Sequence, residues 1–391
     1  MIGLLTDRTA AARARIRPLS PLLYFQRNPG RTLPVAFVIV VAVALVASVV
    51  TVVNSIDLTV MTMYGYQRHF TAVTPRNAFT VSDDIQQAIR SQPLVKQTFT
   101  TRPALTVVKT IFGKMPFVVF GLSKEGRETV MRQCGLRLVS GRMPAEGSPE
   151  VALHADIARN RKLKLGDVVL KPDSEDSYSL IPMRLVGTFD GPVWLALGSE
   201  SFIQGNFPLS TQGIVILART EQDQRTLDRI LDKKLDKSRC RTWTFASLVR
   251  ETQDALSSLY LIMNVVITII IFAIAFLTGM LANIYFMQRI PEFATLSAIG
   301  YQRRALLRRI LAEIGLLCIA GWVLGSLLNV ALLLGIQHWI MTPRGLLVDP
   351  WDLSAYRYAI PLPITIALFA VLPISRRLRT LDPVSIIEKR A

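Results

Sequence analysis

The sequence predicts a helical membrane protein with four spans, arranged as one plus three, and an α/β extracytoplasmic domain between the first and second spans. Three observations support this fold class. Four apolar runs are long enough to cross a hydrocarbon core, which needs about 20 helical residues. One run lies near the N-terminus and three lie in the last third of the chain, so a long polar block separates the first two. Basic residues flank the runs unequally, which predicts their orientation.

The first apolar run covers residues 35–53 and contains only Ser48 and Thr51 as polar residues. We expect it to remain as a membrane anchor, because it is too long and begins too far from the N-terminus for a cleavable signal peptide. The last run, residues 356–374, contains prolines. These are compatible with a spanning helix, since neighbouring helices can satisfy the backbone groups that the prolines leave without a partner. The later runs cover residues 259–287, 310–336 and 356–374.

The distribution of basic residues predicts which side of the membrane each segment faces. Lys and Arg in short loops are retained on the cytoplasmic side. Six arginines against one acid precede the first run, and five against one acid lie between the second and third runs. The expected organisation is a cytoplasmic N-terminal segment (1–33), transmembrane helix 1 (34–53), an extracytoplasmic domain (54–258), transmembrane helix 2 (259–287), a cytoplasmic loop (288–309), transmembrane helix 3 (310–336), a short extracytoplasmic loop (337–355), transmembrane helix 4 (356–374) and a cytoplasmic tail (375–391).

The formal net charge of +17 does not indicate a nucleic-acid partner. In a soluble protein such an excess would favour binding to phosphate backbones. Here most of it lies beside the apolar runs, where attraction to anionic lipid headgroups accounts for it. We therefore expect membrane lipids, and no nucleic acid, among the partners.

The polar block has the texture of a mixed α/β domain. Apolar positions at helical spacing predict helices over 82–91 and 222–235. The segment 245–258 is expected to continue as a helix into the second span, giving one rigid helix over 245–287. Short alternating or apolar runs bounded by turn residues predict strands. They cover residues 104–108, 117–120, 151–153, 168–170, 183–186 and 213–217.

Residue patterns of catalysis and metal binding are missing from the sequence. The three histidines are far apart and lack the spacing of a zinc site. The sequence has no G-x-S-x-G nucleophile elbow and no Walker phosphate loop, so we expect neither a hydrolase nor ATP binding by this chain. Cys134 and Cys240 both lie in the expected extracytoplasmic domain, where a disulfide between them and two free, packed thiols are alternative interpretations.

Three features of the membrane half go beyond apolar composition. Glu313 lies about one turn inside the third span, where an ionisable group costs at least about 2–3 kcal/mol unless it faces a partner or water. It either extends to the headgroups or forms a functional pair. Gly321 and Gly325 form a G-x-x-x-G step that permits close helix approach, to the fourth span or to a second copy. The loop 288–309 is basic and predicted to be helical, and a helix lying on the lipid surface is one interpretation.

This loop also carries a resemblance to a known family. Residues 289–301 read RIPEFATLSAIGY and are followed by Arg308, Glu313, Gly321 and Gly325. They resemble the signature R-x-x-E-[IF]-G-x-L-R-A-[LI]-G-A of FtsX-like permeases of type VII ABC transporters, which include the MacB, LolC/LolE and DevC types. Ala294, Ser297 and Tyr301 depart from the signature. Residues 27–32 and 381–384 resemble the family's entry to the first helix and its C-terminal ending. Four short segments of the polar block are similar to the MacB-like periplasmic core, namely 141–142, 150–153, 165–167 and 184–187.

The resemblance implies a non-catalytic permease subunit in the bacterial inner membrane, with both termini in the cytoplasm. ATP and Mg would be bound by a separate ABC ATPase pair, and the permease would form a dimer with a second copy or a paralogue. A membrane-fusion adaptor is a further candidate partner. In the family the loop 288–309 corresponds to a coupling helix that docks onto the ATPase. The candidate coupling residues are Glu292, Phe293, Leu296, Ala298 and Gly300.

Two functions are compatible with such a subunit. In the first, ATP binding and hydrolysis drive motion of the periplasmic domain and so export or extract a lipid, lipoprotein, peptide or hydrophobic compound. In the second, an FtsX-like signalling subunit activates an extracytoplasmic partner and moves no substrate. The length of the block 54–258 favours the first function, because FtsX has a smaller outer domain on the same scaffold.

Overall fold

A computed structural model describes residues 21–379, and the chain divides into two compact units. The helical unit holds the described residues of 1–53, 261–334 and 350–391. The α/β unit holds residues 54–260 and 335–349. The fold class predicted from the sequence is confirmed, because four helices are long and apolar enough to cross a membrane and a mixed α/β domain lies between the first and second of them.

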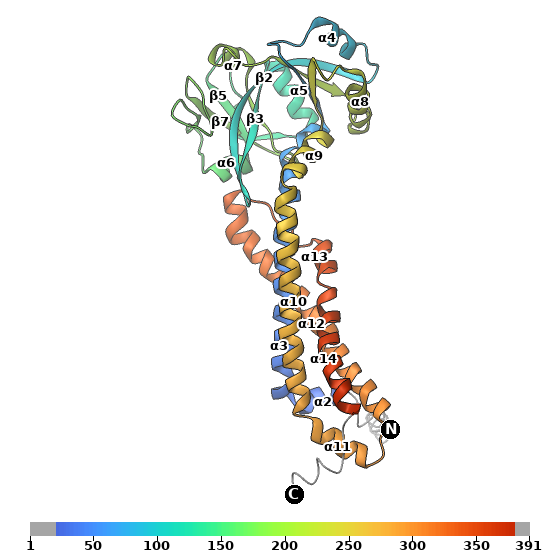
Figure 1. The fold of residues 1–391 in the computed structure, drawn as a ribbon. Coiled ribbons are helices and arrows are strands. Elements are labelled where there is room, and N and C mark those ends of the chain that lie inside the picture. The colour runs from blue at the N-terminus through green and yellow to red at the C-terminus, as the bar shows by residue number, and fades with distance from the viewer. Residues whose placement is uncertain (1–20, 380–391) are drawn as a thin grey trace, which may run out of the picture. The chain divides into compact units, whose positions relative to one another are not determined.

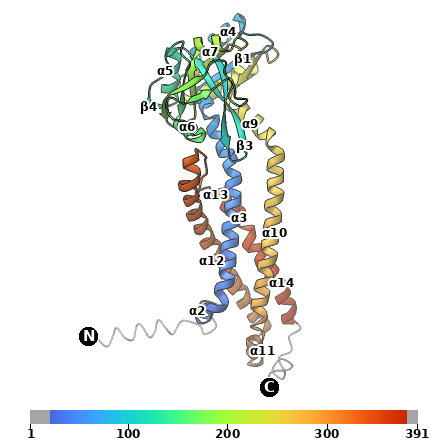
Figure 2. The same ribbon diagram turned by 90° about the vertical axis from the view of Figure 1, so that its left-hand side faces the viewer.

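The helical unit is built from long apolar helices that run beside one another (Figure 1, Figure 2). The four candidate spans are Thr32–Met63, Ser257–Met287, Arg304–Arg344 and Leu353–Pro373. Its described helices are α2 (Pro21–Arg27), α3 (Pro29–Met63), α10 (Ser257–Met287), α11 (Ile290–Ala298), α12 (Arg303–Ile336), α13 (Leu353–Tyr358) and α14 (Pro361–Arg379).

Apolar side chains occupy both the inside and the outside of these helices. Ile39, Val43 and Ala275 are buried in the core between the helices, whereas Ile269 and Leu324 are exposed on the outside. A helix that is apolar all round is typical of a membrane span, where lipid covers the outer face. This pattern explains why the sequence identified the spans without showing which helices contact each other.

A buried polar chain joins three helices of this unit. The Ser48 hydroxyl on α3 donates to Asn329 Oδ1 on α12 at 2.6 Å, and Asn329 Nδ2 donates to the Tyr356 hydroxyl on α13 at 3.3 Å. Tyr356 in turn donates to the Pro350 carbonyl at 3.0 Å. A polar group without a partner in hydrocarbon is costly, so these bonds favour one arrangement of the three helices. Each contributes about 0.6 kcal/mol on average in membrane proteins.

The α/β unit contains a 10-stranded mixed sheet in the order β10-β1-β9-β2-β3-β8-β5-β7-β4, with β6 paired to β7. The pairs β3–β8 and β5–β7 are parallel, and the other neighbours are antiparallel. The strands are β1 (Thr71–Pro75), β2 (Val95–Thr110), β3 (Gly113–Leu122), β4 (Arg137–Gly141), β5 (Glu150–His154), β6 (Val168–Leu170), β7 (Met183–Asp190), β8 (Ala196–Ser199), β9 (Gly213–Ala218) and β10 (Cys240–Trp243).

Short helices pack against this sheet and form two apolar clusters with it. The larger cluster includes Phe70, Phe117 and Trp194, and the smaller one includes Ile89 and Leu227. Side-chain caps begin several of the helices, with Thr220 accepting from the Asp223 N–H at 3.1 Å as an example. The helices are η1 (Gly65–Arg68), α4 (Asp83–Arg90), α5 (Lys124–Gln133), α6 (Ala155–Arg161), α7 (Glu200–Asn206), α8 (Glu221–Lys234), α9 (Phe245–Ala255), the π-helix η2 (Gln337–Met341) and η3 (Thr342–Arg344).

The segment between the third and fourth spans packs against the α/β unit. Asn160 on α6 is buried and donates to the carbonyls of Lys109 at 2.8 Å and Arg344 at 3.1 Å. Gly345 has a φ of +59°, and a Cβ there would lie 2.4 Å from the Asp156 carbonyl oxygen. Two segments that are distant in sequence, 54–260 and 335–349, therefore belong to one compact unit.

Two expectations for this unit need correction. The predicted continuous helix over 245–287 is interrupted, because α9 ends at Ala255 and α10 begins at Ser257, with Leu256 between them at φ −91° and ψ 0°. Cys134 and Cys240 are free thiols, so the disulfide alternative is wrong in this structure. They are buried in different apolar clusters, which prevents their approach, and burial raises the pKa of the Cys134 thiol.

Candidate functional site

The candidate coupling segment forms the short helix α11 between α10 and α12. Pro291 lies in its first turn, where the missing N–H costs no hydrogen bond. The helix ends at Ala298, and Gly300 follows with a φ of +102°, which is accessible to glycine and strained for other residues. The N–H groups of Gly300 and Tyr301 donate to the carbonyls of Ser297 and Leu296, both at 3.1 Å. This turn lets the chain reverse into α12 within a few residues.

Arg289, the residue before α11, is buried and holds the two flanking helices together. Its Nη1 donates to a Glu313 oxygen on α12, and its Nε lies 3.2 Å from Glu292 Oε2. The guanidinium carbon also lies 3.6 Å from the ring centroid of Tyr24 on α2 and 5.1 Å from that of Phe293. A delocalised guanidinium suits such a place, because it can pair with a carboxylate and stack on aromatic faces at the same time.

Glu313 is buried and paired, which rules out the interpretation that it extends to the headgroups. Its carboxylate accepts from Arg289, and its Oε1 lies 3.1 Å from Arg309 Nε on the same helix. Its side chain is only 4% exposed, so it does not extend to headgroups. Two cations therefore balance one buried carboxylate and satisfy its oxygens, which offsets the cost of its burial.

One face of α11 is anchored and the other is exposed. Phe293 is buried and stacks on Phe286 of α10, with ring centroids 4.9 Å apart. Ala294 is also buried, and Leu296 is half-buried against the same apolar cluster. Ala298, Gly300 and Glu292 are exposed. Four of the five candidate coupling residues thus retain surface for a partner, whereas Phe293 does not and serves to fix the helix.

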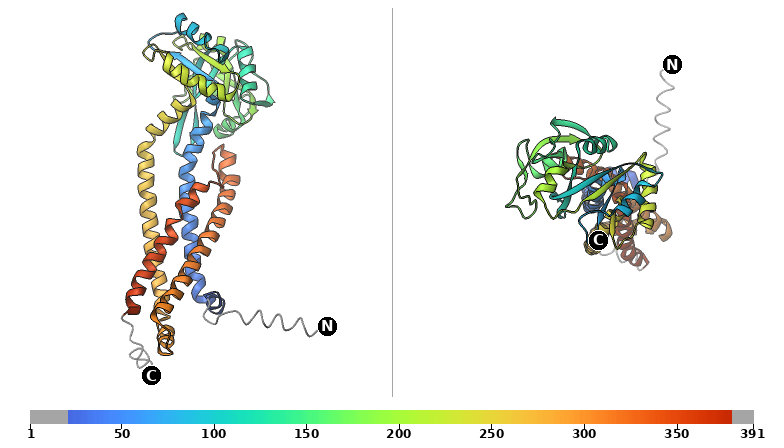
Figure 3. Two further views of the ribbon diagram at one scale, coloured as in Figure 1. Left: turned by 90° about the vertical axis from the view of Figure 1, so that its right-hand side faces the viewer. Right: turned by 90° about the horizontal axis from the view of Figure 1, so that it is seen from above.

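The G-x-x-x-G step on α12 packs against the first span. A Cβ at Gly321 would lie 2.4 Å from Ile39 Cγ2, and a Cβ at Gly325 would lie 2.7 Å from the Val40 carbonyl oxygen, both on α3. Of the two alternatives for this step, packing against the fourth span is therefore wrong. The fourth span instead packs at Gly279 of α10, where a Cβ would lie 2.5 Å from Phe369 Cβ on α14. Figure 3 shows both pairs side by side, α12 with α3 and α14 with α10.

Sequence reasoning missed the aromatic part of the site. Tyr24 and Tyr285 lie around Arg289 but are more than 250 residues apart in the chain, so no local spacing connects them. The sequence does show the two charged residues of the site, because Arg289 and Glu313 lie at the ends of apolar runs. Among the described residues, no group of three or more His, Cys, Asp or Glu side chains is arranged to hold a metal ion.

One protein family matches the segment that contains α11. Residues 261–383, which include α11 and its anchoring charges, match the model of the FtsX-like permease C-terminal family. The match covers this segment, which is less than half of the chain. The matched segment runs from within α10 through α14 and includes Arg289, Glu313 and the glycine step on α12.

Solved structures of extracytoplasmic domains are also similar to part of this chain. The periplasmic region of MacB from Actinobacillus actinomycetemcomitans is 11% identical, with 47% of this chain and 92% of that chain covered at a TM-score of 0.28. The extracellular domain of the ABC-type transporter YknZ from Gram-positive bacteria is also 11% identical, with 45% and 100% covered at a TM-score of 0.28. No curated protein matches the chain.

Proposed function

We propose that the chain is the permease subunit of an ABC transporter and that α11 is the helix on which a separate ATPase subunit docks. The observation that carries this proposal is a short helix with one buried and one exposed face, inside a segment that matches the FtsX-like permease C-terminal family. The chain itself is non-catalytic in this proposal. ATP and Mg are bound by the partner ATPase pair.

The contacts of α11 support a mechanical role. Arg289 joins α11 to Glu313 on α12, and the stacked pair Phe293–Phe286 joins it to α10. A force applied to the exposed face of α11 is therefore passed to two spans at once. To shift a two-state equilibrium from 1:99 to 99:1, the ATPase must favour one state by about 5.5 kcal/mol. The helix is interrupted at Leu256, so α9 and α10 are two separate helices and not the single rigid helix that the sequence predicts.

The proposed orientation has α11 and both termini in the cytoplasm of a bacterium and the α/β unit outside its inner membrane. Basic residues near α11 support this side, since Arg304 and Arg308 are exposed at the start of α12. Residues 335–349 belong to the same compact unit as residues 54–260, which agrees with a proposed extracytoplasmic location for both segments. We further propose a dimer with a second copy or a paralogue, with a membrane-fusion adaptor as an additional partner.

The proposed transport reaction is export or extraction of a lipid, lipoprotein, peptide or hydrophobic compound, driven by motion of the α/β unit. The large sheet of this unit supports such a role, because it provides a rigid body that a moving span can displace. If the α/β unit instead activates an extracytoplasmic enzyme while no substrate moves, the signalling function replaces transport and the coupling site stays the same.

Photo-crosslinking from α11 tests the docking proposal. A photo-reactive amino acid in place of Ala298, which is exposed, should capture a subunit that carries Walker motifs, and ATP should change the yield. The matched control has the same amino acid in place of Leu209, which is 81% exposed in the α/β unit, and should not capture that subunit. Capture of the ATPase from Leu209 and not from Ala298 would contradict the proposal.

A further inference from the structure

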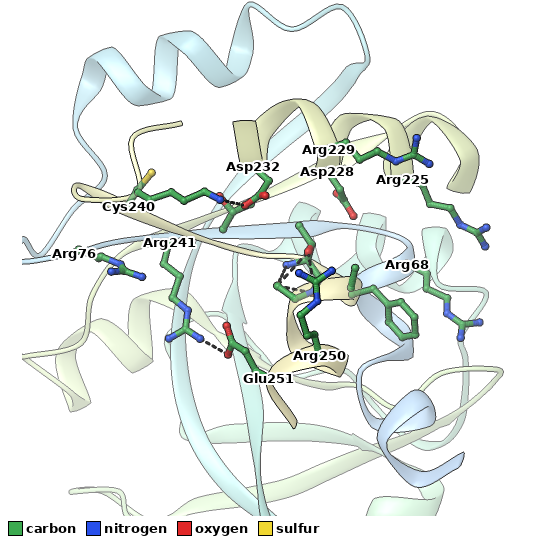
Figure 4. Close-up of a pocket in the computed structure, with 16 residues that line it drawn as sticks. Arg68, Arg76, Arg225, Asp228, Arg229, Asp232, Cys240, Arg241, Arg250 and Glu251 are labelled. Atoms are coloured by element: carbon green, nitrogen blue, oxygen red, sulfur yellow. Dashed lines mark hydrogen bonds and ion pairs between the residues drawn. The ribbon is translucent and has the colours of Figure 1, made fainter. Parts of the chain in front are cut away.

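A cationic groove lies in the α/β unit, and the residues that line it are outside the family-matched segment 261–383. It has a volume of about 810 Å³ and lies between α8, α9, β10 and η1. Seven Lys or Arg residues and three Asp or Glu residues line it. Figure 4 shows that Arg250 from α9 and Asp228 from α8 extend into the space between the two helices, with Arg68 and Arg241 at its sides. A volume of this size is typical of small-ligand sites, which measure about 300–1,000 Å³.

Internal ion pairs neutralise only part of the positive charge. Lys237 pairs with Asp232 at 3.0 Å, and Arg241 pairs with Glu251. The third acid, Asp228, is half-buried and accepts from Thr71 and Gln224, and burial raises its pKa. Four lining arginines have no carboxylate within ion-pair distance among residues 21–379, namely Arg68, Arg76, Arg229 and Arg250.

Two of the guanidinium groups are held in place by aromatic rings. The guanidinium carbon of Arg241 lies 3.7 Å from the ring centroid of Trp243, and that of Arg68 lies 4.4 Å from the ring centroid of Phe245. A guanidinium that is already ordered loses less entropy when it binds an anion. Arg241 is paired with Glu251, so the ordered charge that the groove presents is that of Arg68.

The N-terminus of α9 adds backbone donors to the same groove. Thr244 and Ser247 form a capping box that uses their own N–H groups. Phe245 and Ala246, the first two residues of the helix, line the groove, and their N–H groups have no partner within the described part of the chain. A helix N-terminus favours negative charge, and phosphate is the anion that such positions bind most commonly.

We propose that this groove binds a phosphate-bearing anionic ligand of small-molecule size. Unpaired arginines, ordered guanidinium groups and helix N–H groups converge on one cavity, and together they match the several oxygens of a phosphate group. The site goes beyond the proposed coupling function, because it shares no residue with α11 and does not need an ATPase. The phosphate comes either from a lipid headgroup or from a soluble phosphate compound.

Binding measurements on the full chain in detergent test the site. The probes are inorganic pyrophosphate and dihexanoyl phosphatidylglycerol, with dihexanoyl phosphatidylcholine as the uncharged comparison. The variant Arg229→Gln/Arg250→Gln removes two exposed, unpaired cations and should weaken binding of at least one anionic probe by about tenfold or more. The matched control Arg90→Gln/Arg132→Gln removes two exposed cations outside the groove and should bind like the parent.

The two probes distinguish the source of the phosphate. Groove-dependent binding of phosphatidylglycerol assigns a lipid headgroup, and groove-dependent binding of pyrophosphate alone assigns a soluble compound. Equal weakening in the control variant would show a general charge effect and overturn the proposal, as would unchanged binding in the groove variant. Groove-dependent binding of an acidic octapeptide with no binding of either phosphate probe would also overturn it. Thermal unfolding of each variant verifies that the unit remains folded.

Discussion

Replacing Arg289 by methionine is expected to destabilise the helical unit by about 3–5 kcal/mol. The change removes the cation that pairs with Glu313 and bonds to Glu292, and it leaves a buried carboxylate with Arg309 as its remaining ionic partner. Methionine keeps much of the side-chain volume, so the loss reflects charge more than a cavity. Thermal unfolding of the purified chain in detergent measures the effect.

The double variant Arg289→Met/Glu313→Met separates charge balance from packing. Replacing both members of a buried ion pair by apolar residues is often neutral or stabilising, so the double variant should regain most of the stability lost by the single one. Its ATPase capture at position 298 should still fall, because the ion pairs of Arg289 with Glu292 and Glu313 no longer hold α11 against α12. A single variant as stable as the parent would show that Arg289 and Glu313 do not form the pair described here.

The substitution Gly325→Ala is expected to destabilise the packing of α12 on α3 by about 1–3 kcal/mol. The new Cβ would lie 2.7 Å from both the Val40 carbonyl oxygen and Val43 Cβ, and a backbone oxygen cannot rotate away as a flexible side chain can. The two helices must therefore separate. Thermal unfolding in detergent measures the loss, and a cysteine crosslink between the two helices measures their separation.

The control for this substitution lies on the same helix. Gly315→Ala places a Cβ where no heavy atom lies within 4 Å, and it should be neutral or stabilise α12 by roughly 0.5–1 kcal/mol, because alanine is the better helix former. Gly321→Ala should be destabilising and should recover when Ile39→Ala provides space, since Ile39 Cγ2 is the atom that it meets. Equal stability of the Gly325→Ala and Gly315→Ala variants would contradict close packing at this step.

The sequence was sufficient for features that depend on local composition. The six predicted strands all lie within observed strands, and the run 168–170 coincides with β6. The helices predicted at 82–91 and 222–235 correspond to α4 and α8. Strong periodicity and length make such elements visible without knowledge of the fold.

The sequence was insufficient where distant segments meet. The strand β8 has a short, fully buried sequence, Ala196–Ser199, with no alternation to reveal it. The helix that Gly321 contacts could not be predicted either, because every span is apolar on all sides. The exposed face of α11 depends on Arg289 reaching Glu313, 24 residues later in the chain. Phe293 was therefore assigned to a partner surface although it is buried.

The central proposal is that α11 and the α/β unit lie on opposite sides of a membrane, with α11 in the cytoplasm. Cysteine labelling in intact cells tests it most directly. The native cysteines are buried, and the single variants Ala298→Cys and Lys164→Cys add exposed thiols on α11 and in the α/β unit. An impermeant maleimide should label Lys164→Cys in cells with a permeable outer envelope, and should label Ala298→Cys only after the inner membrane is opened. Labelling of Ala298→Cys from outside, with protection of Lys164→Cys, would contradict the account.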